Sequence, residues 1–152
     1  MTDKQVTVTD IRLAAMNLLA MREHSARELQ RKLGQRFDDT ALIAAAIAGL
    51  STDNLQSDER YTEAFISMRK RQGKGPVRIA LELKEKGISA TLIDTYLDAA
   101  DPDWFELASA EKQKRFGAAA PANMKEKARQ VRFLQYRGFT QAQILAAIHA
   151  GE

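Results

Sequence analysis

The side chains best suited to binding in this sequence are cations that gather around a glycine turn. Five of them stand close together, at Arg69, Lys70, Arg71, Lys74 and Arg78. They straddle the end of one expected helix and the start of the next, which begins at Pro76. Cations in a last helical turn also stabilise the helix dipole, which gives part of the cluster a purely structural explanation. The functional explanation is an anion site, because the N-terminus of the Pro76 helix presents N–H groups to a phosphate or carboxylate.

A second group of cations follows a later expected helix, over residues 123–137. Its members are Lys125, Lys127, Arg129, Arg132 and Arg137. At helical spacing, Lys125, Arg129 and Arg132 share one face with Tyr136. A ring among cations suits stacking on a nucleic-acid base or packing on a protein. A solvated face with a half-buried tyrosine explains the same pattern, and the sequence leaves both explanations open.

The charge of the chain is distributed unevenly around a net value of +3. Residues 1–68 carry eight basic and ten acidic side chains, whereas residues 69–152 carry fifteen and ten. Within 112–137, eight basic side chains accompany a single acid, Glu126. This asymmetry favours an anionic partner for the basic part of the chain. A solvated cationic face that maintains solubility is the plain alternative.

Spacings typical of catalysis or metal binding are missing from the sequence. It contains no cysteine, and His24 and His149 are far apart and have no ligand spacing with acids. Both histidines are expected at the surface or at a helix end. The serines that precede expected helices act as caps rather than nucleophiles, and no phosphate-cradling glycine loop occurs. The sequence therefore predicts a binding protein that uses no cofactor and no metal, and an enzyme is the least expected class.

The same composition gives an expectation for the compartment. A chain without cysteine suits a reducing, intracellular environment. Its first residues lack the apolar centre of a secretory signal, and no apolar run reaches the length of a membrane span. We therefore expect a cytoplasmic protein that does not contact a membrane.

The elements that must position these cations are all expected to be helices. No segment alternates apolar and polar residues with period two, while apolar residues recur at helical spacing between capping residues. Nine helices are expected, the first opening at Thr9 or Asp10, and they fall into three groups of three. The predicted domains are a disordered or extended N-terminus over 1–8 and three-helix modules over 9–52, 53–100 and 101–152.

An internal repeat supports this division into modules. Four apolar positions recur at a constant offset of fifty, with Leu29, Leu33, Ile43 and Ile47 matching Ile79, Leu83, Ile93 and Leu97. The turn after the second helix of a module recurs as well, since Gly87 corresponds to Gly138. In the first module Arg36 precedes Phe37 with no glycine between them, so that turn must be built differently. Each module is too small to be stable alone, which requires packing between modules.

The aromatic side chains are expected mainly in the core. At helical spacing they are typical of buried faces between helices. The expected core residues are Tyr61, Phe65, Trp104, Phe105, Phe133 and Phe139. Trp104, next to Pro102, is expected to seal the junction between the second and third modules.

Three segments of the chain resemble a known family. They are Leu55-x-Ser57-Asp58-x-Arg60-Tyr61-x-Glu63, Lys74-Gly75-Pro76-x-Arg78-Ile79-x-x-Glu82-Leu83-x-x-Lys86-Gly87-Ile88 and Phe133-Leu134-x-Tyr136-Arg137-Gly138-Phe139. In this order they are similar to the RecX family of bacterial regulators of the RecA recombinase. The likeness runs from about Thr9 to the end of the chain, and the absence of a glycine before Phe37 is a departure from it.

The resemblance implies both a fold and a function. The fold is all-α, with three tandem three-helix modules in an elongated and curved molecule. The function is negative regulation of RecA, in which the protein occupies the groove of the RecA–DNA filament. Filament growth, ATPase activity and strand exchange would then be limited, which links the protein to DNA repair and the SOS response. The expected partners are the filament and its single- or double-stranded DNA, bound by a monomer.

Two other functions stay open at this point. A direct DNA-binding protein would compete for the strand itself, whereas a helical adaptor would have no link to nucleic acid. In the regulator and in the DNA-binding protein, the same cations are expected to make the contacts. They are Arg69, Lys70, Arg71, Lys74, Arg78, Lys125, Arg129, Arg132 and Arg137.

Overall fold

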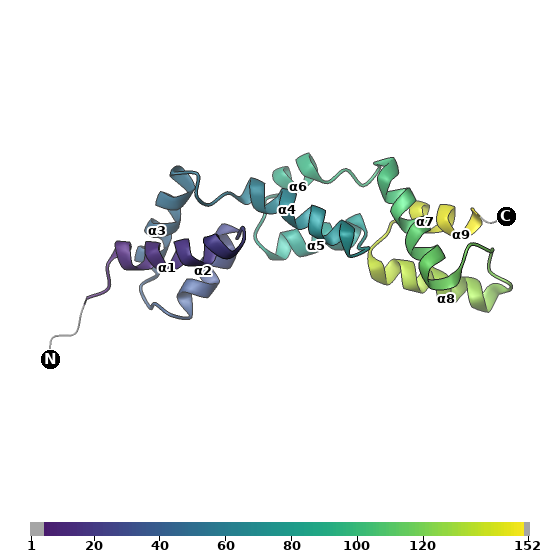
Figure 1. The fold of residues 1–152 in the computed structure, drawn as a ribbon, viewed down its shortest axis with the longest axis horizontal. Coiled ribbons are helices and arrows are strands. Elements are labelled where there is room, and N and C mark those ends of the chain that lie inside the picture. The colour runs from purple at the N-terminus through teal and green to yellow at the C-terminus, as the bar shows by residue number, and fades with distance from the viewer. Residues whose placement is uncertain (1–4, 151–152) are drawn as a thin grey trace.

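The computed structural model describes residues 5–150, and this part of the chain contains nine α-helices and no strand (Figure 1). The helices are α1 (Val8–Met21), α2 (Ala26–Gly34), α3 (Thr40–Thr52), α4 (Asp58–Arg71), α5 (Pro76–Glu85), α6 (Ala90–Tyr96), α7 (Pro102–Phe116), α8 (Met124–Arg137) and α9 (Gln141–His149). The predicted all-α class is thereby confirmed. Residues 1–4 of the segment expected to be disordered lie outside the described residues.

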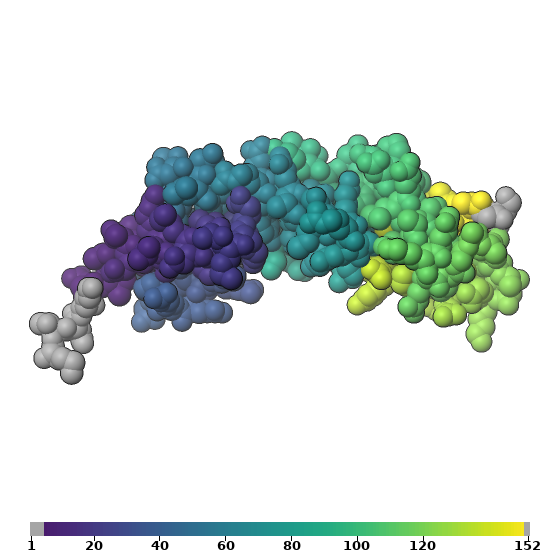
Figure 2. Space-filling view, viewed as in Figure 1, coloured from purple at the N-terminus to yellow at the C-terminus, as the bar shows by residue number. Residues whose placement is uncertain are grey.

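The helices form three successive trios in an elongated, gently arched molecule, with the two ends of the chain at its opposite ends (Figures 1 and 2). Extensive helix–helix contacts occur within the trios α1–α3, α4–α6 and α7–α9. Each trio has a hydrophobic cluster of its own. We refer to the trios as modules 1, 2 and 3, while the domain boundaries after residues 52 and 100 stay predictions.

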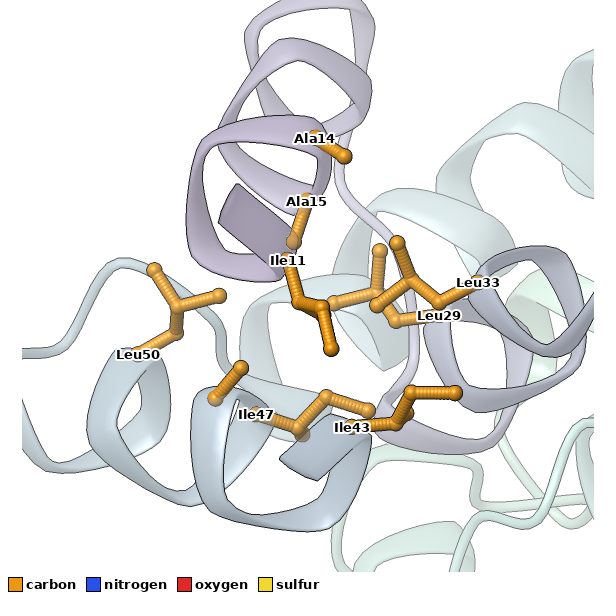
Figure 3. Close-up of a cluster of buried hydrophobic side chains, with 9 residues drawn as sticks. Ile11, Ala14, Ala15, Leu29, Leu33, Ile43, Ile47 and Leu50 are labelled. Atoms are coloured by element: carbon orange, nitrogen blue, oxygen red, sulfur yellow. The ribbon is translucent and has the colours of Figure 1, made fainter. Parts of the chain in front are cut away.

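Module 1 shows how the repeated apolar positions build a core. Ile11 of α1 points between Leu29 and Leu33 of α2 and the isoleucines of α3, Ile43 and Ile47 (Figure 3). All five side chains are buried. Complete burial of an aliphatic side chain of this size stabilises the fold by about 1.5–3 kcal/mol. Short helices such as the nine-residue α2 depend on this packing, because isolated helices of that length are marginal in water.

Polar side chains fix where the helices begin. Ser25 and Thr140 form capping boxes with Glu28 and Gln143. Ser57, Ser89 and other polar residues cap their helices through a hydroxyl, carboxylate or amide oxygen that accepts from a backbone N–H. The predicted start of α1 at Thr9 or Asp10 is wrong. Thr7 is the N-cap, because its hydroxyl accepts from the Asp10 N–H while the Asp10 carboxylate accepts from the Thr7 N–H.

Modules are joined end to end through their second helices. The Arg137 carbonyl at the end of α8 accepts from the Gly75 N–H at the start of α5, at 2.8 Å, and the Gly138 carbonyl accepts from the Val77 N–H at 2.9 Å. At the other end of α5, the Lys86 carbonyl accepts from the Ser25 hydroxyl at the start of α2, at 2.8 Å. Helix ends with opposite partial charges therefore meet at both junctions.

The repeated glycine is explained by this contact. Gly87 and Gly138 have φ of +80° and +99°, and both lie against the preceding module. A Cβ at Gly138 would lie 2.3 Å from the Arg78 Cβ, and one at Gly87 would lie 2.7 Å from the Arg27 Cβ. Among residues 5–150 no module stands before module 1, and the turn after α2 makes no such contact. There α2 ends in right-handed backbone, and the Phe37 N–H bonds to the Leu33 carbonyl.

The aromatic side chains follow the prediction in part. Trp104 is buried, belongs to α7, and packs into the cluster of module 2, so its expected role at the junction is confirmed. Tyr61, Phe65 and Phe139 are buried as well. Phe105 and Phe133 are only half-buried, which contradicts their assignment to the core. Phe133 packs against the cluster of module 3 with its ring edge-on to Phe116, and the guanidinium groups of Arg115 and Arg137 also lie over the ring.

One expected surface residue is in fact buried. His24, in the connection between α1 and α2, is 1% exposed. Its Nδ1 lies 3.0 Å from the Arg22 carbonyl and its Nε2 lies 3.0 Å from the Lys32 Nζ. Since an ammonium group only donates, Nε2 accepts and Nδ1 carries the proton. The His24 carbonyl also accepts from the side-chain amide of Gln56, just before α4. His24 therefore belongs to the first junction, which lies between modules 1 and 2.

Over residues 5–150, no helix is long and apolar enough to span a bilayer.

Candidate binding surface

The first predicted cluster divides into paired and unpaired cations. Arg69 and Arg78 both bond to the carboxylate of Glu82, with an Nη2–Oε2 distance of 2.6 Å for Arg69 and an Nε–Oε1 distance of 3.0 Å for Arg78. The Arg69 guanidinium also lies over the ring of Phe65, 5.2 Å from its centroid. The Arg69–Glu82 pair ties α4 to α5, while the Arg78–Glu82 pair lies within α5, so both arginines have a structural role.

Lys70 and Arg71, next in the chain, point to different surroundings. The Lys70 Nζ lies 4.6 Å from the centroid of the Trp104 ring, so this cation covers the aromatic side chain at the second junction. Arg71 is exposed, and its guanidinium donates to the Ser67 hydroxyl at 3.1 Å. A bond to a neutral hydroxyl leaves its charge available, so Arg71 is the member of the cluster most open to an anion.

Lys74 lies in the strongest positive surroundings of this cluster. Its partial burial lowers the pKa of its amine, and the neighbouring charges of Arg78, Arg137 and Arg69 lower it further. The cations of α4 and α5 are therefore close to Arg137 of module 3. The N–H groups of Gly75 and Val77, which the sequence offered to an anion, are bonded to carbonyls of module 3 instead. An anion could therefore contact the cationic side chains, but not the N–H groups at the start of α5, which already have acceptors.

The second predicted cluster lies on an open face of α8. Lys125, Arg129, Arg132 and Tyr136 are all exposed, and Tyr136 retains 74% of its accessible surface. A half-buried tyrosine is thus excluded. The Arg129 guanidinium makes a long 3.6 Å ion pair with Glu126. Exposed pairs of this kind contribute little stability, and the cations of the stripe are open to solvent.

Tyr136 links the two clusters across the junction between modules 2 and 3. The Arg78 guanidinium lies 5.3 Å from the centroid of its ring and donates to its carbonyl at 3.2 Å. Arg137, the next residue, donates to the Gln72 carbonyl at 3.1 Å. The structure therefore brings residues from both predicted clusters together at this junction, while Lys125 lies at the far end of α8.

A hollow of about 260 Å³ opens where α4, α7 and α8 meet. We call it the junction hollow, and its lining residues are Arg71, Gln72, Glu111, Lys114, Arg115, Phe133 and Arg137. Lys114 and Arg115 were not predicted to belong to a site, although both fall in the segment with the greatest excess of positive charge. They occupy the last turn of α7, a position that suggests a helix-dipole role before the fold is known.

A second hollow of about 450 Å³ adjoins it along α4, at the junction between modules 1 and 2. Tyr61, Phe65 and Met68 form part of its lining, together with charged residues that include Glu28 and Arg71. Burial raises the pKa of the Tyr61 hydroxyl, and the charge of Glu28 adds to this increase. Because Arg71 lines both hollows, they form neighbouring parts of one surface.

Glu28, the carboxylate that lines the second hollow, is held by cations. Burial alone would raise the pKa of the Glu28 carboxyl, but hydrogen bonds from Arg22 and the Ser25 N–H and the charges of Arg22 and Lys86 lower it overall. A carboxylate held by cations in this way is a poor general base. The described residues contain no group of three or more His, Cys, Asp or Glu side chains that could hold a metal.

Comparison with known proteins identifies relatives over most of the chain. Family models described as RecX, second three-helix domain, and RecX, third three-helix domain, match residues 57–97 and 101–148. The protein named Regulatory protein RecX from Halorhodospira halophila is 42% identical over 142 residues, which cover 93% of this chain and 88% of the relative. Its namesake from Pseudomonas savastanoi pv. phaseolicola is 44% identical, covering 88% of this chain and 86% of the relative.

Solved structures agree on the fold. The crystal structure of RecX from Lactobacillus salivarius superposes with a TM-score of 0.79, covering 94% of this chain and 95% of that chain at 21% identity. A second crystal structure, of a regulatory protein RecX, gives a TM-score of 0.72 at 18% identity and covers 94% of this chain and 78% of that chain. At such identities the likeness concerns the fold alone.

Proposed function

The chain belongs to the RecX family of regulatory proteins, and from this premise we propose that it is a negative regulator of a RecA-type recombinase. It binds in the groove of the RecA–DNA filament and limits filament growth, ATPase activity and strand exchange. The protein acts in the cytoplasm as a monomer, in DNA repair and the SOS response. It acts by occupying a surface and turns over no substrate.

The observation that carries this proposal is the placement of cations on an elongated scaffold. Arg71, Lys74 and Arg137 gather at the junction of modules 2 and 3, and the stripe of Lys125, Arg129 and Arg132 lies exposed on α8. A filament repeats the same protomer along its length. Contacts from successive modules then add through effective concentration, so that no single deep pocket is needed.

The test is the ATPase activity of the recombinase on single-stranded DNA, with the protein added before or after filament assembly. The double substitution of Arg71→Glu with Lys74→Glu is expected to preserve the fold and to weaken inhibition by about tenfold or more, because it reverses two charges at the junction. The matched control is Arg31→Glu with Lys84→Glu, two exposed cations outside the predicted site. It should inhibit as the unchanged protein does.

Inhibition that survives the first double substitution would remove Arg71 and Lys74 from the site. Inhibition lost equally in both double variants would show that total charge, and not this surface, determines binding.

A direct DNA-binding protein is the second candidate, and the exposed Tyr136 among cations is the observation that favours it. Such a ring can stack on an unpaired base. The two candidates differ in one measurement, which is affinity for the filament and for bare DNA at the same salt concentration. The regulator binds the filament more tightly, whereas equal affinities support competition for the strand. Both affinities should fall as salt rises, since exposed cations are screened.

A further inference from the structure

The junction hollow concentrates positive charge that the fold itself does not neutralise. Four cations line it, Arg71 from module 2 and Lys114, Arg115 and Arg137 from module 3. None of them has a carboxylate within ion-pair distance among the described residues, whereas Arg22, Arg60, Arg69 and Arg78 all do. Like charges gathered without a counter-charge repel one another, so the hollow is stabilised by an anion that enters it.

The carboxylate that lines the hollow does not fill this role. Glu111 is 8% exposed, and its side chain lies against Gly73, where any Cβ would come within 1.7 Å of the Glu111 Oε1. It therefore occupies the wall next to α4, where the absence of a side chain at Gly73 makes room for it. One carboxylate among four cations leaves a clear excess of positive charge.

Two of the guanidinium groups are held in position before any ligand arrives. The guanidinium carbons of Arg115 and Arg137 lie 5.5 and 5.1 Å from the centroid of the Phe133 ring. That ring is held edge-on by Phe116, with centroids 5.4 Å apart, and Arg137 is also tied to the Gln72 carbonyl. Side chains that are already ordered lose less entropy on binding. The half-buried ring of Phe133 thus orders the guanidinium groups of Arg115 and Arg137.

We propose that the junction hollow binds a phosphate group and that the bound phosphate holds modules 2 and 3 together. Guanidinium groups donate paired hydrogen bonds that match the geometry of phosphate oxygens. Arg71 lies on α4, whereas the other three cations lie on α7 and α8. A phosphate that contacts both sides therefore adds a bond between the modules. The phosphate comes from a nucleic-acid strand or from a free nucleotide or inorganic phosphate, and the site requires no recombinase.

The experiment uses the full chain at low ionic strength, with inorganic pyrophosphate and a single-stranded oligodeoxythymidine as separate probes. Binding is measured by titration calorimetry, and the Arg Nε–H signals of the unchanged protein are followed by NMR. The double substitution Lys114→Gln with Arg115→Gln is expected to weaken binding by about tenfold or more, since charged hydrogen bonds are lost. The control Arg31→Gln with Lys84→Gln removes equal charge from two exposed positions outside the predicted site and should change affinity by about twofold or less.

The two probes distinguish the sources of the phosphate. If the oligonucleotide binds in the hollow and pyrophosphate displaces it, the phosphate comes from a nucleic-acid strand. If pyrophosphate binds tightly but the oligonucleotide binds no more tightly than pyrophosphate, the site takes free phosphate. Pyrophosphate should also raise the melting temperature of the unchanged protein but not that of the Lys114/Arg115 double variant. Equal loss in both double variants, or NMR signals of Arg115 and Arg137 that do not respond to either probe, would overturn the proposal.

If no phosphate binds in the junction hollow, the proposal that the protein regulates the filament is unaffected, because inhibition of the recombinase is measured independently. Conversely, a protein that binds pyrophosphate in the hollow but does not affect the recombinase would retain this site and lose the regulatory function.

Discussion

The junction between modules 1 and 2 and the junction between modules 2 and 3 share the same helix-end contact, but they differ in how their charged side chains are paired. Across the first junction, Arg60 pairs with Glu23 at 2.9 Å and Lys86 pairs with Glu28 at 3.7 Å. Across the second junction, no ion pair joins the described side chains of modules 2 and 3. Instead, backbone bonds to Arg137 and Gly138 carry the contact. Acidic side chains thus neutralise cations across the first junction, whereas among the described residues no carboxylate pairs with a cation across the second.

The first junction also shows what the motif around Ser57 does. The Asp58 Oδ1 accepts from the Ala26 N–H and from the Gln56 amide, both at 2.9 Å. Arg60 reaches Glu23 and also donates to the Asn54 side chain and carbonyl. These residues hold module 1 against module 2. A motif that resembles a family signature is here a structural joint, and the unpaired cations lie elsewhere.

The largest expected effect comes from filling the space between helix ends with a methyl group. Gly138→Ala adds backbone strain and a clash with Arg78, whose backbone N would lie 2.8 Å from the new Cβ. We expect a loss of about 4 kcal/mol in unfolding free energy. Gly87→Ala meets only the Arg27 side chain and should cost about 3 kcal/mol. Urea unfolding followed by circular dichroism measures both.

Gly117→Ala is the matched control for these glycines. Gly117 has φ of +86° and no atom within 4 Å of an added Cβ, so this change adds backbone strain alone, about 2 kcal/mol. Fluorescence of Trp104, the single tryptophan, reports separation of the second junction. The Trp104 fluorescence should change at a lower urea concentration in Gly138→Ala than in Gly117→Ala. Equal losses of unfolding free energy in the three variants would show that the close approach of helix ends at the junctions does not contribute to the cost of these substitutions.

The next effect concerns the polar contacts of the first junction. Asp58→Ala leaves the Ala26 N–H and the Gln56 amide without their acceptor, and an unsatisfied buried donor costs about 1–3 kcal/mol. Asp58→Asn keeps an oxygen at that position and should lose less than half as much. The measurement is again unfolding free energy in urea. If alanine and asparagine were equally destabilising, the negative charge rather than the acceptor would hold the junction.

The smallest effect is a pH dependence that belongs to the first junction and not to the second. Burial lowers the pKa of His24 below its usual 6.5; the Arg22 carbonyl opposes this change, and the charges of Arg22 and Lys32 strengthen it. The unfolded chain therefore binds a proton before the folded one, and stability falls as pH drops below about 6.5. A tenfold difference in proton affinity between the folded and unfolded chains corresponds to about 1.4 kcal/mol. Glu28 adds its own loss only at lower pH, because its pKa is lowered from 4.5.

Unfolding free energies at about pH 7.5 and about pH 5.5 test this, because histidine is the side chain whose ordinary pKa lies in that window. His24→Gln should remove the difference between the two pH values, and His149→Gln, at an exposed position, should retain it. An unchanged pH dependence in His24→Gln would place the responsible group elsewhere.

Local features could be predicted because their causes lie within a few residues. The caps at Ser25 and Thr140, the helix starting at Pro76 and the turn at Gly87 each follow from neighbouring side chains and backbone preference. The prediction for His24 was wrong because its burial depends on Lys32 and on Gln56 of another module. Likewise, Phe133 has the pattern of a core residue, and only the packing of α7 against α8 shows that it lies half-buried at the edge of the module 3 cluster.

The sequence by itself determined the helices, the repeat and the excess of positive charge, since these depend on spacing along the chain and on composition. Only the tertiary structure decided which cations remain without a counter-charge. Arg69 and Arg78 are paired because α5 places Glu82 beside them, while Lys114 and Arg115 face Arg71 across a junction. Charge pairing depends on distances in space, and a sequence specifies these only after the modules have packed.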